Sequence, residues 1–271
     1  MRGARPIVLL TDFGDDDFYA GILRAVISAA SPASPIIDLS HGIAAHNVRA
    51  ASFVLASALP YLPADAVVVA VIDPGVGGAR RGIIVETGGR AIVAPDNGLA
   101  SDLIATAGGL EFTAIADDRI PALTSAGTRG ATFHGRDVFA PVAAALARGV
   151  SSRQFGDETG GVVMLRDVPS VSVADGCVTG AGRMVDRFGN ILTDIPRRVV
   201  ERAFAWHACR VTVGGVDAGP PRGTYSDGTH GELMAIFNSW DRVEAAVREG
   251  RAIDRFGGAA PEEIRFEIHA A

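Results

Sequence analysis

Two short apolar runs, each followed closely by an aspartate, constrain the fold of this 271-residue chain more than any other feature. The first run is residues 6–10 (PIVLL) and the second is residues 66–72 (AVVVAVI). Uninterrupted apolar runs of this length are typical of strands that are buried on both faces of a sheet. Asp12 and Asp73 follow the two runs, so we expect both carboxylates at the carboxyl edge of the sheet, where ligands bind.

Helical patterns alternate with the strand candidates, which predicts an α/β domain with a Rossmann-like, largely parallel sheet. The expected strands are residues 6–10, 36–39, 66–72, 83–86 and 91–94, the last two forming a hairpin. The expected helices are residues 16–30, 48–59, 98–105 and 136–148. Asn47 is expected to cap the second helix, and Phe18 and Ile22 to lie on one apolar face of the first.

The pattern changes after about Gly149. Short strand-like runs separated by Gly, Asp and Pro turns then predict a small all-β domain. These runs are residues 182–185, 190–194, 209–213, 233–237 and 264–269. We therefore predict an N-terminal α/β domain over residues 1–165 and a C-terminal β domain over residues 172–271.

The composition excludes several classes of function. The chain contains no lysine, which excludes P-loop and Schiff-base chemistry because both need an amine. A formal net charge of −6 argues against a nucleic-acid partner. Cys177 and Cys209 lack CxxC spacing and are expected as free thiols. No apolar run approaches the roughly 18 residues of a membrane span, and the start has no signal-peptide pattern, so we expect a cytoplasmic protein without a membrane partner.

The segment TDFGDDDFYAG contains four acids in six residues. Asp15, Asp16 and Asp17 are consistent with a metal site or with charges that offset the macrodipole at a helix N-terminus. Asp12 stands in the strand-to-helix turn, where a carboxylate can accept two hydrogen bonds from a ribose diol or can simply form the turn. His207, His230 and His269 show no metal-ligand spacing, and we predict no metal site.

Two further segments, DPGVGGARR and FHGRD, supply an Asp, an Arg and a His that could hold and polarise a water molecule. In such a set the His or the Asp accepts the proton, while the Arg fixes the carboxylate. The alternatives are a polar loop around Asp73 and a helix cap or core group for His134. Phe133, which precedes His134, is a further candidate for substrate binding.

The C-terminal half contains two segments with polar side chains suited to a ligand. In MVDRFGN, Asp186 could pair with an ammonium group, and the Asn190 amide could bind an adenine edge. A bulged hairpin with Asx turns is the alternative. In FNSW, Ser239 could hold a carboxylate, and Trp240 could stack on the ligand or cover the core.

The motifs TDFGDDDFYAG, DLSHGI, DPGVGGARR, APDNGL, FHGRD and DRFGN, in this order, resemble those of the S-adenosyl-L-methionine hydroxide adenosyltransferase family. The resemblance implies a Rossmann-like N-terminal domain, a barrel-like C-terminal domain, and a homotrimer with sites at the subunit interfaces. It also implies the hydrolysis of S-adenosyl-L-methionine to adenosine and L-methionine without a cofactor.

The resemblance further implies a role for each matched residue. Asp73, Arg80 and His134 resemble the water-activating set, with Arg80 preferred to Arg81 because the family arginine stands seven residues after the aspartate. The implied substrate-binding residues are Asp12 for the ribose diol, Asp186 and Asn190 for the methionine amino group and adenine, and Ser239 for the methionine carboxylate. The related halide-using enzymes carry a serine where Gly135 stands, and a tyrosine where Asp73 stands.

Two other functions compete with this interpretation. Calcium-dependent nucleoside hydrolases also have an Asp-rich segment after the first strand, although Leu10 here occupies the place of their first aspartate. A sensor that binds an adenosyl ligand without turnover would retain every pocket residue.

Overall fold

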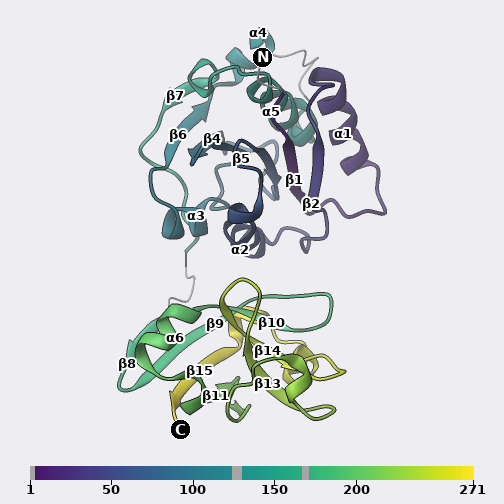
Figure 1. Cartoon of the computed structure of the whole chain (residues 1–271). Coiled ribbons are helices and arrows are strands. Elements are labelled where there is room, and N and C mark those ends of the chain that lie inside the picture. The colour runs from purple at the N-terminus through teal and green to yellow at the C-terminus, as the bar shows by residue number, and fades with distance from the viewer. Residues whose placement is uncertain (1–3, 124–129, 167–170) are drawn as a thin grey trace. The chain divides into compact units, whose positions relative to one another are not determined.

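The computed structural model describes residues 4–123, 130–166 and 171–271. The chain divides into two compact units, Met1–Arg166 and Asp167–Ala271 (Figure 1). The expected boundary region, residues 165–172, includes residues 167–170, which lie outside the described part of the chain. Among the described residues, no helix is both long and apolar enough to span a membrane.

One sheet organises the first unit, and its described strands run in the order β2-β1-β3-β5-β4-β6-β7. The strands are β1 (Ile7–Thr11), β2 (Ile36–Ser40), β3 (Val67–Val71), β4 (Gly82–Thr87), β5 (Arg90–Pro95), β6 (Glu111–Ile115) and β7 (Gly156–Glu158). β2, β1, β3 and β5 pair in parallel, and the other three strands pair antiparallel. The predicted α/β class and the predicted hairpin of β4 and β5 are confirmed, whereas β6 and β7 were not predicted.

The helices of the first unit are α1 (Tyr19–Ala30), α2 (Val48–Ala58), α3 (Ser101–Thr106), α4 (Ile120–Leu123) and α5 (Ala140–Ala147). The predicted cap of α2 is confirmed, because Asn47 Oδ1 accepts a hydrogen bond from the Ala50 N–H at 2.9 Å. The predicted face of α1 is wrong. The helix begins at Tyr19, so Phe18 precedes it and is 68% exposed, while Leu23 and Ile27 are buried.

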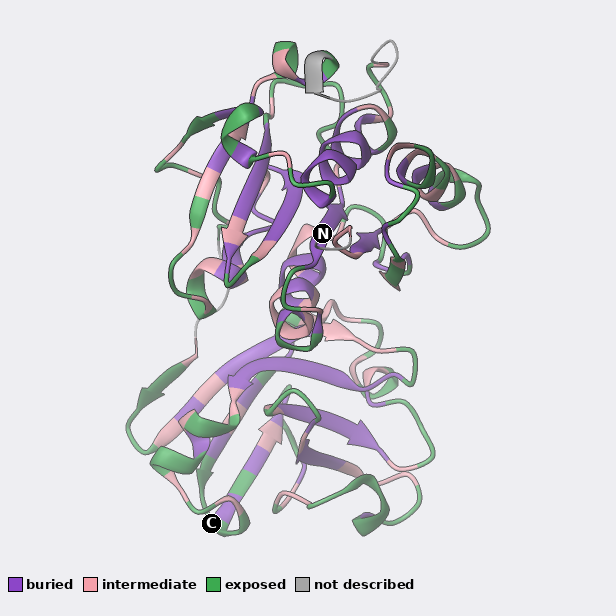
Figure 2. Cartoon of the chain, turned by 45° about the horizontal axis from the view of Figure 1, so that its top comes forward, coloured by how far each residue is buried: buried purple, intermediate pink, exposed green. Residues whose placement is uncertain are grey.

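The core of the first unit lies on the central strands. Every residue of β1 and β3 is buried, as expected for strands covered on both faces (Figure 2). All eight residues of α5 are also buried, and its alanines allow the helix to pack closely on the sheet. This packing fixes the carboxyl ends of β1 and β3, from which the candidate site is built.

The second unit is a sheet in which all described strands pair antiparallel. Its elements are β8 (Ser172–Ala174), β9 (Cys177–Val185), β10 (Ile191–Pro196), α6 (Arg197–Ala203), β11 (Cys209–Val213), β12 (Val216–Asp217), β13 (Leu233–Phe237), β14 (Arg242–Val247) and β15 (Arg265–Ala270). The predicted small all-β domain is confirmed. Neither α6 nor β14 was predicted.

Candidate active site

Asp12 and Asp73 leave neighbouring strands at the same edge of the sheet. β1 pairs in parallel with β3, and Thr11 is in register with Val71. Asp12 follows β1 directly, and Asp73 lies two residues beyond β3. Asp12 and Asp73 therefore follow the carboxyl ends of two neighbouring strands, as the apolar runs in the sequence predicted.

The loop between β3 and β4 lies directly against the segment that carries His134. Gly77 in this loop has a φ of +77°, and a Cβ at this position would stand 2.5 Å from the Ala131 carbonyl oxygen. A larger residue would be strained by its backbone and would also clash with that carbonyl. A glycine is therefore required for the close approach of the two segments.

Arg80 connects Asp73 to His134. Its Nε donates to Asp73 Oδ1 at 2.9 Å, and one terminal nitrogen donates to Asp73 Oδ2. The same terminal nitrogen lies 2.7 Å from His134 Nδ1. The Asp73 and Arg80 side chains are only 6% and 11% exposed, and His134 is 4% exposed. The three predicted residues thus form one buried, hydrogen-bonded group.

The protonation of His134 follows from this geometry. A guanidinium group can only donate hydrogen bonds, so Nδ1 of His134 must accept the one from Arg80. The neutral ring then carries its proton on Nε2. In this arrangement Asp73 is the negatively charged acceptor of the group, and the ring is a hydrogen-bond donor through Nε2.

Arg81 has a different environment from Arg80. Its Nε donates to Asp96 Oδ2 at 2.8 Å, and a terminal nitrogen contacts the Gly161 carbonyl oxygen. Asp96 also accepts from the Val163 N–H at 2.7 Å. Of the two consecutive arginines, only Arg80 contacts Asp73 and His134 in the described contacts.

His134 stands at the start of a π-helical turn, Gly135–Phe139, that leads into α5. Such turns are rare and occur frequently at functional sites. The Arg–Asp pair of FHGRD is used within this turn, because Arg136 Nε donates to Asp137 Oδ1 at 2.6 Å. That hydrogen bond is the main cause of the lowered pKa of the Asp137 carboxyl. Asp137 in turn accepts from the Gly130 N–H at 2.7 Å, which holds the segment before His134.

Aromatic side chains surround this end of the sheet. Phe133 packs edge-on against Phe13 and Tyr19, with ring centroids 5.7 Å and 5.1 Å apart. A Cβ at Gly135 would stand 3.0 Å from the Phe133 ring and 3.3 Å from the Phe13 ring. The sequence analysis identified Phe133 but missed Phe13 and Tyr19, although both stand in the TDFGDDDFYAG motif.

The Asp12 turn is held by the loop after β2. Asp12 Oδ2 accepts the His46 N–H at 2.8 Å, and the Gly14 N–H donates to the His41 carbonyl oxygen at 2.8 Å. His46 adopts a φ of +66°, which is uncommon for a residue other than glycine. A carboxylate has about four acceptor sites, so Asp12 can still accept hydrogen bonds from a diol.

The three acids Asp15, Asp16 and Asp17 are exposed and precede α1. None of them lies in the first turn of that helix, and no side chain caps it. These acids therefore lie directly before the N-terminus of the helix, not inside its first turn. In residues 4–123, 130–166 and 171–271, no group of three or more His, Cys, Asp or Glu side chains is arranged to hold a metal ion.

In the second unit, Asp186 and Asn190 close the turn between β9 and β10. The Asn190 N–H donates to Asp186 Oδ1 at 2.9 Å, and Asn190 Nδ2 donates to Asp186 Oδ2 at 3.0 Å. The two side chains thus hold the turn, and acceptor sites remain on both of them. Phe188, within the same turn, is 74% exposed.

Two residues that the sequence analysis missed lie near Asp186. The Tyr225 hydroxyl donates to Glu244 Oε1 at 2.6 Å, and Glu244 is 2% exposed. Burial is the main cause that raises the pKa of both side chains, and the charge of Asp186 raises both further. Glu244 belongs to β14, so the failure to predict that strand concealed this group.

Ser239 and Trp240 occupy the turn between β13 and β14. Asn238 Oδ1 accepts from the Trp240 N–H at 3.0 Å and from the Arg242 N–H at 3.1 Å, which fixes the turn. Ser239 is exposed and Trp240 is 45% exposed. Trp240 was expected either to stack on the ligand or to cover the core, and its exposure argues against the second role.

Comparison with known proteins gives consistent matches over both units. The profile of the SAM hydroxide adenosyltransferase N-terminal domain matches residues 7–156, and that of the C-terminal domain matches residues 183–265. A Salinispora tropica protein named (R)-S-adenosyl-L-methionine hydrolase is 36% identical, covering 96% of each chain. A Thermus thermophilus protein of the same name is 37% identical, covering 93% of this chain and 96% of its own. The crystal structure of an uncharacterized conserved protein from Thermotoga maritima superimposes with a TM-score of 0.88 at 32% identity, covering 97% of this chain and 99% of that chain.

Proposed function

The chain belongs to the SAM hydroxide adenosyltransferase family, and we propose that it hydrolyses S-adenosyl-L-methionine to adenosine and L-methionine. The observation that carries the proposal is the buried contact of Asp73, Arg80 and His134. Water is a poor nucleophile, and its attack on carbon needs a base that is positioned to accept a proton. This group supplies such a base at the edge of the sheet where ligands bind in α/β folds.

Asp73 is the proton acceptor in the proposed reaction. Arg80 fixes both carboxylate oxygens and occupies His134 Nδ1, so the ring retains its proton on Nε2. The ring is then suited to orient the water through Nε2–H rather than to deprotonate it. The water oxygen forms a bond to C5′ of the ribose, its proton passes to Asp73, and the C5′–S bond breaks. The electron pair of that bond goes to the sulfonium sulfur, which leaves as the neutral thioether of methionine.

The remaining predicted residues bind the substrate. Asp12 accepts a hydrogen bond from each hydroxyl of the ribose diol, and the Phe13, Tyr19 and Phe133 rings exclude water around the sugar. Rigid placement of C5′ beside the water lowers the barrier by orientation.

The methionine and adenine contacts come from the second unit. Asp186 binds the methionine ammonium group, and Asn190 binds adenine. Ser239 binds the methionine carboxylate. Trp240 stacks on the ligand.

Three further features of the proposal come from the family. The reaction uses no cofactor, and the protein is a homotrimer with sites at subunit interfaces. The names of the relatives specify the (R) configuration at sulfur, and we extend this preference to the present chain. Light scattering of the purified protein tests the trimer, and separate assays of the two sulfonium epimers test the stereochemistry.

Product analysis tests the reaction class. Purified protein incubated with S-adenosyl-L-methionine should release adenosine and methionine in equal amounts, and the products can be quantified by mass spectrometry. Release of adenine, with loss of activity in the presence of a chelator, would instead support a calcium-dependent nucleoside hydrolase. Tight binding without any product would support a sensor.

A further inference from the structure

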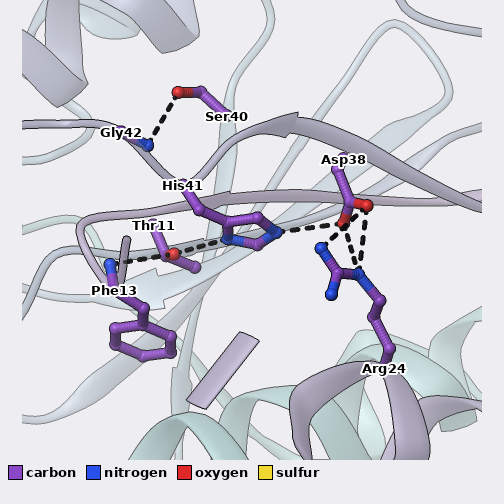
Figure 3. Close-up of polar contacts among 7 residues, drawn as sticks. All are labelled: Thr11, Phe13, Arg24, Asp38, Ser40, His41 and Gly42. Atoms are coloured by element: carbon purple, nitrogen blue, oxygen red, sulfur yellow. Dashed lines mark hydrogen bonds and ion pairs between the residues drawn. The ribbon is translucent and has the colours of Figure 1, made fainter. Parts of the chain in front are cut away.

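A second hydrogen-bonded histidine lies near the Asp12 turn and is not part of the group around Asp73. His41 is 4% exposed and lies between Thr11, at the end of β1, and Asp38 in β2 (Figure 3). Its Nδ1 is 2.7 Å from Thr11 Oγ1, and its Nε2 is 3.0 Å from Asp38 Oδ1. Asp38 in turn accepts a bifurcated hydrogen bond from the Arg24 Nε–H, which lies 3.0 Å from both carboxylate oxygens.

A ring that carries its proton on Nε2 gives these four groups a consistent set of donors and acceptors. The Phe13 N–H donates to Thr11 Oγ1 at 3.2 Å, so the hydroxyl proton is available for His41 Nδ1. In this form the ring donates from Nε2 to the Asp38 carboxylate and accepts at Nδ1 from the Thr11 hydroxyl. Each of these donors and acceptors then has a partner. We name this series, Phe13 N–H, Thr11, His41 and Asp38, the buried relay.

The buried relay is not a nucleophilic triad, although it contains a hydroxyl, an imidazole and a carboxylate. Thr11 is completely buried, and its oxygen already accepts the Phe13 N–H. A nucleophile must reach the substrate, so Thr11 cannot attack one. The relay must therefore act through the residues that it holds.

Those residues are the ones on either side of Asp12. The relay fixes Thr11 and the Phe13 N–H, and the His41 carbonyl oxygen accepts the Gly14 N–H. His41 thus contacts residues on both sides of Asp12: Thr11 through its ring and Gly14 through its carbonyl oxygen. Hydrogen bonds between buried polar groups have defined geometry, and leaving one partner unsatisfied is costly.

We propose that His41, through Thr11, is a positioning residue that sets the Asp12 carboxylate for recognition of a ribose 2′,3′-diol. This inference rests on the proposed function, because it needs Asp12 to bind the ribose. His41 itself does not contact the substrate in this proposal. Asp38 is the outer end of the relay, and it pairs there with Arg24, which lies outside the relay; the side chains of Arg24 and Asp38 are 38% and 41% exposed.

The test uses a substitution that removes both hydrogen bonds of the Thr11 hydroxyl, to His41 Nδ1 and from the Phe13 N–H, but nearly keeps the volume of the side chain. Thr11→Val replaces the hydroxyl with a methyl group of similar size in a buried strand, whereas His41→Ala would open a cavity. Thr11→Ser keeps the hydroxyl and is the conservative rescue. Arg24→Gln is the matched control at the exposed end, where a surface ion pair contributes little.

The readout is the ratio of the dissociation constants of 2′,3′-dideoxyadenosine and adenosine, measured by calorimetry on the full-length protein. In the wild type this ratio should be about 100 or more, because two hydrogen bonds to a carboxylate are lost. Thr11→Val should lower the ratio about tenfold, while Thr11→Ser and Arg24→Gln should remain within about twofold of the wild type. A merely structural role of Thr11 would lower the melting temperature without changing this ratio.

Two results would overturn the inference, and they can be distinguished. If the wild type does not discriminate between the two nucleosides, Asp12 does not bind the ribose diol, and the proposed role of the relay fails with it. If the wild type discriminates and Thr11→Val retains the full ratio, Asp12 binds the diol without help from His41.

Discussion

Asp73→Asn is the substitution that most directly separates the chemical role of the buried ion pair from its structural role. The amide has nearly the shape of the carboxylate but lacks its charge, so Arg80 loses its anionic partner. The two side chains are 6% and 11% exposed, and breaking a buried pair of this kind typically costs about 3–5 kcal/mol. At about 2–4 °C per kcal/mol, the melting temperature should fall by about 6–20 °C.

The loss of activity should exceed what this destabilisation explains. Removing a general base typically lowers the rate by about 100- to 10,000-fold, whereas the affinity for a bound adenosyl ligand should change by less than about tenfold. We would measure kcat by chromatography at a temperature well below the melting point of the variant, and affinity by calorimetry on the same preparation.

Asp96→Asn is the matched control for this experiment. Asp96 is also buried and pairs with the neighbouring arginine, Arg81, at 2.8 Å. Its substitution should lower the melting temperature but leave kcat within about threefold of the wild type. Wild-type turnover in Asp73→Asn, or an equal loss of turnover in both variants, would refute the assignment of Asp73 as the base.

Three further predictions concern binding, loop geometry and pH. Asp12→Ala should weaken adenosine binding about 100-fold, and an unchanged dissociation constant in calorimetry would exclude the ribose role. Gly77→Ala should lower both kcat and the melting temperature, since its Cβ would stand 2.5 Å from the Ala131 carbonyl oxygen; activity and stability equal to those of the wild type would contradict the required close approach. Burial raises the pKa of the Asp194 carboxyl to about 6, so the folded state binds this proton more tightly than the unfolded chain, and stability should fall by about 2 kcal/mol between pH 4 and pH 7 through this group. Urea unfolding should show that Asp194→Asn removes this decrease, and identical pH profiles of variant and wild type would contradict it.

Much of the fold could be predicted because its strongest signals are local. Continuous apolar runs marked β1 and β3, and the cap at Asn47 marked the start of α2. The predicted bounds of β11 and β13 agree with the structure. In these elements local pattern and tertiary packing favour the same conformation.

The errors arise where tertiary packing decides. β14 (RVEAAV) is rich in residues that favour helices, yet it pairs with β10 and β13. β7 (GDE) is short and polar, so no apolar alternation marked it as a strand. The face of α1 was misassigned because the helix begins later than expected, which removed Phe18 from it.

In the candidate site, too, features set by local sequence could be predicted, and contacts set by tertiary packing could not. Asp12 and Asp73 could be placed because each follows a buried strand, and the positions of both relative to the sheet follow from strand order alone. The contacts of Tyr225 with Glu244, and of His41 with Thr11, join residues 19 and 30 positions apart. No local pattern encodes such contacts, so neither could be found from the sequence.

The measurement that tests the central claim most directly is turnover of S-adenosyl-L-methionine in H₂¹⁸O, with a parallel reaction that contains chloride. If water activated by Asp73 attacks C5′, mass spectrometry should find ¹⁸O on the 5′ oxygen of adenosine, together with methionine and without a chlorinated nucleoside. Adenosine without ¹⁸O, or a product in which chloride has replaced the methionine sulfur, would contradict water attack at C5′ and with it the account of this site.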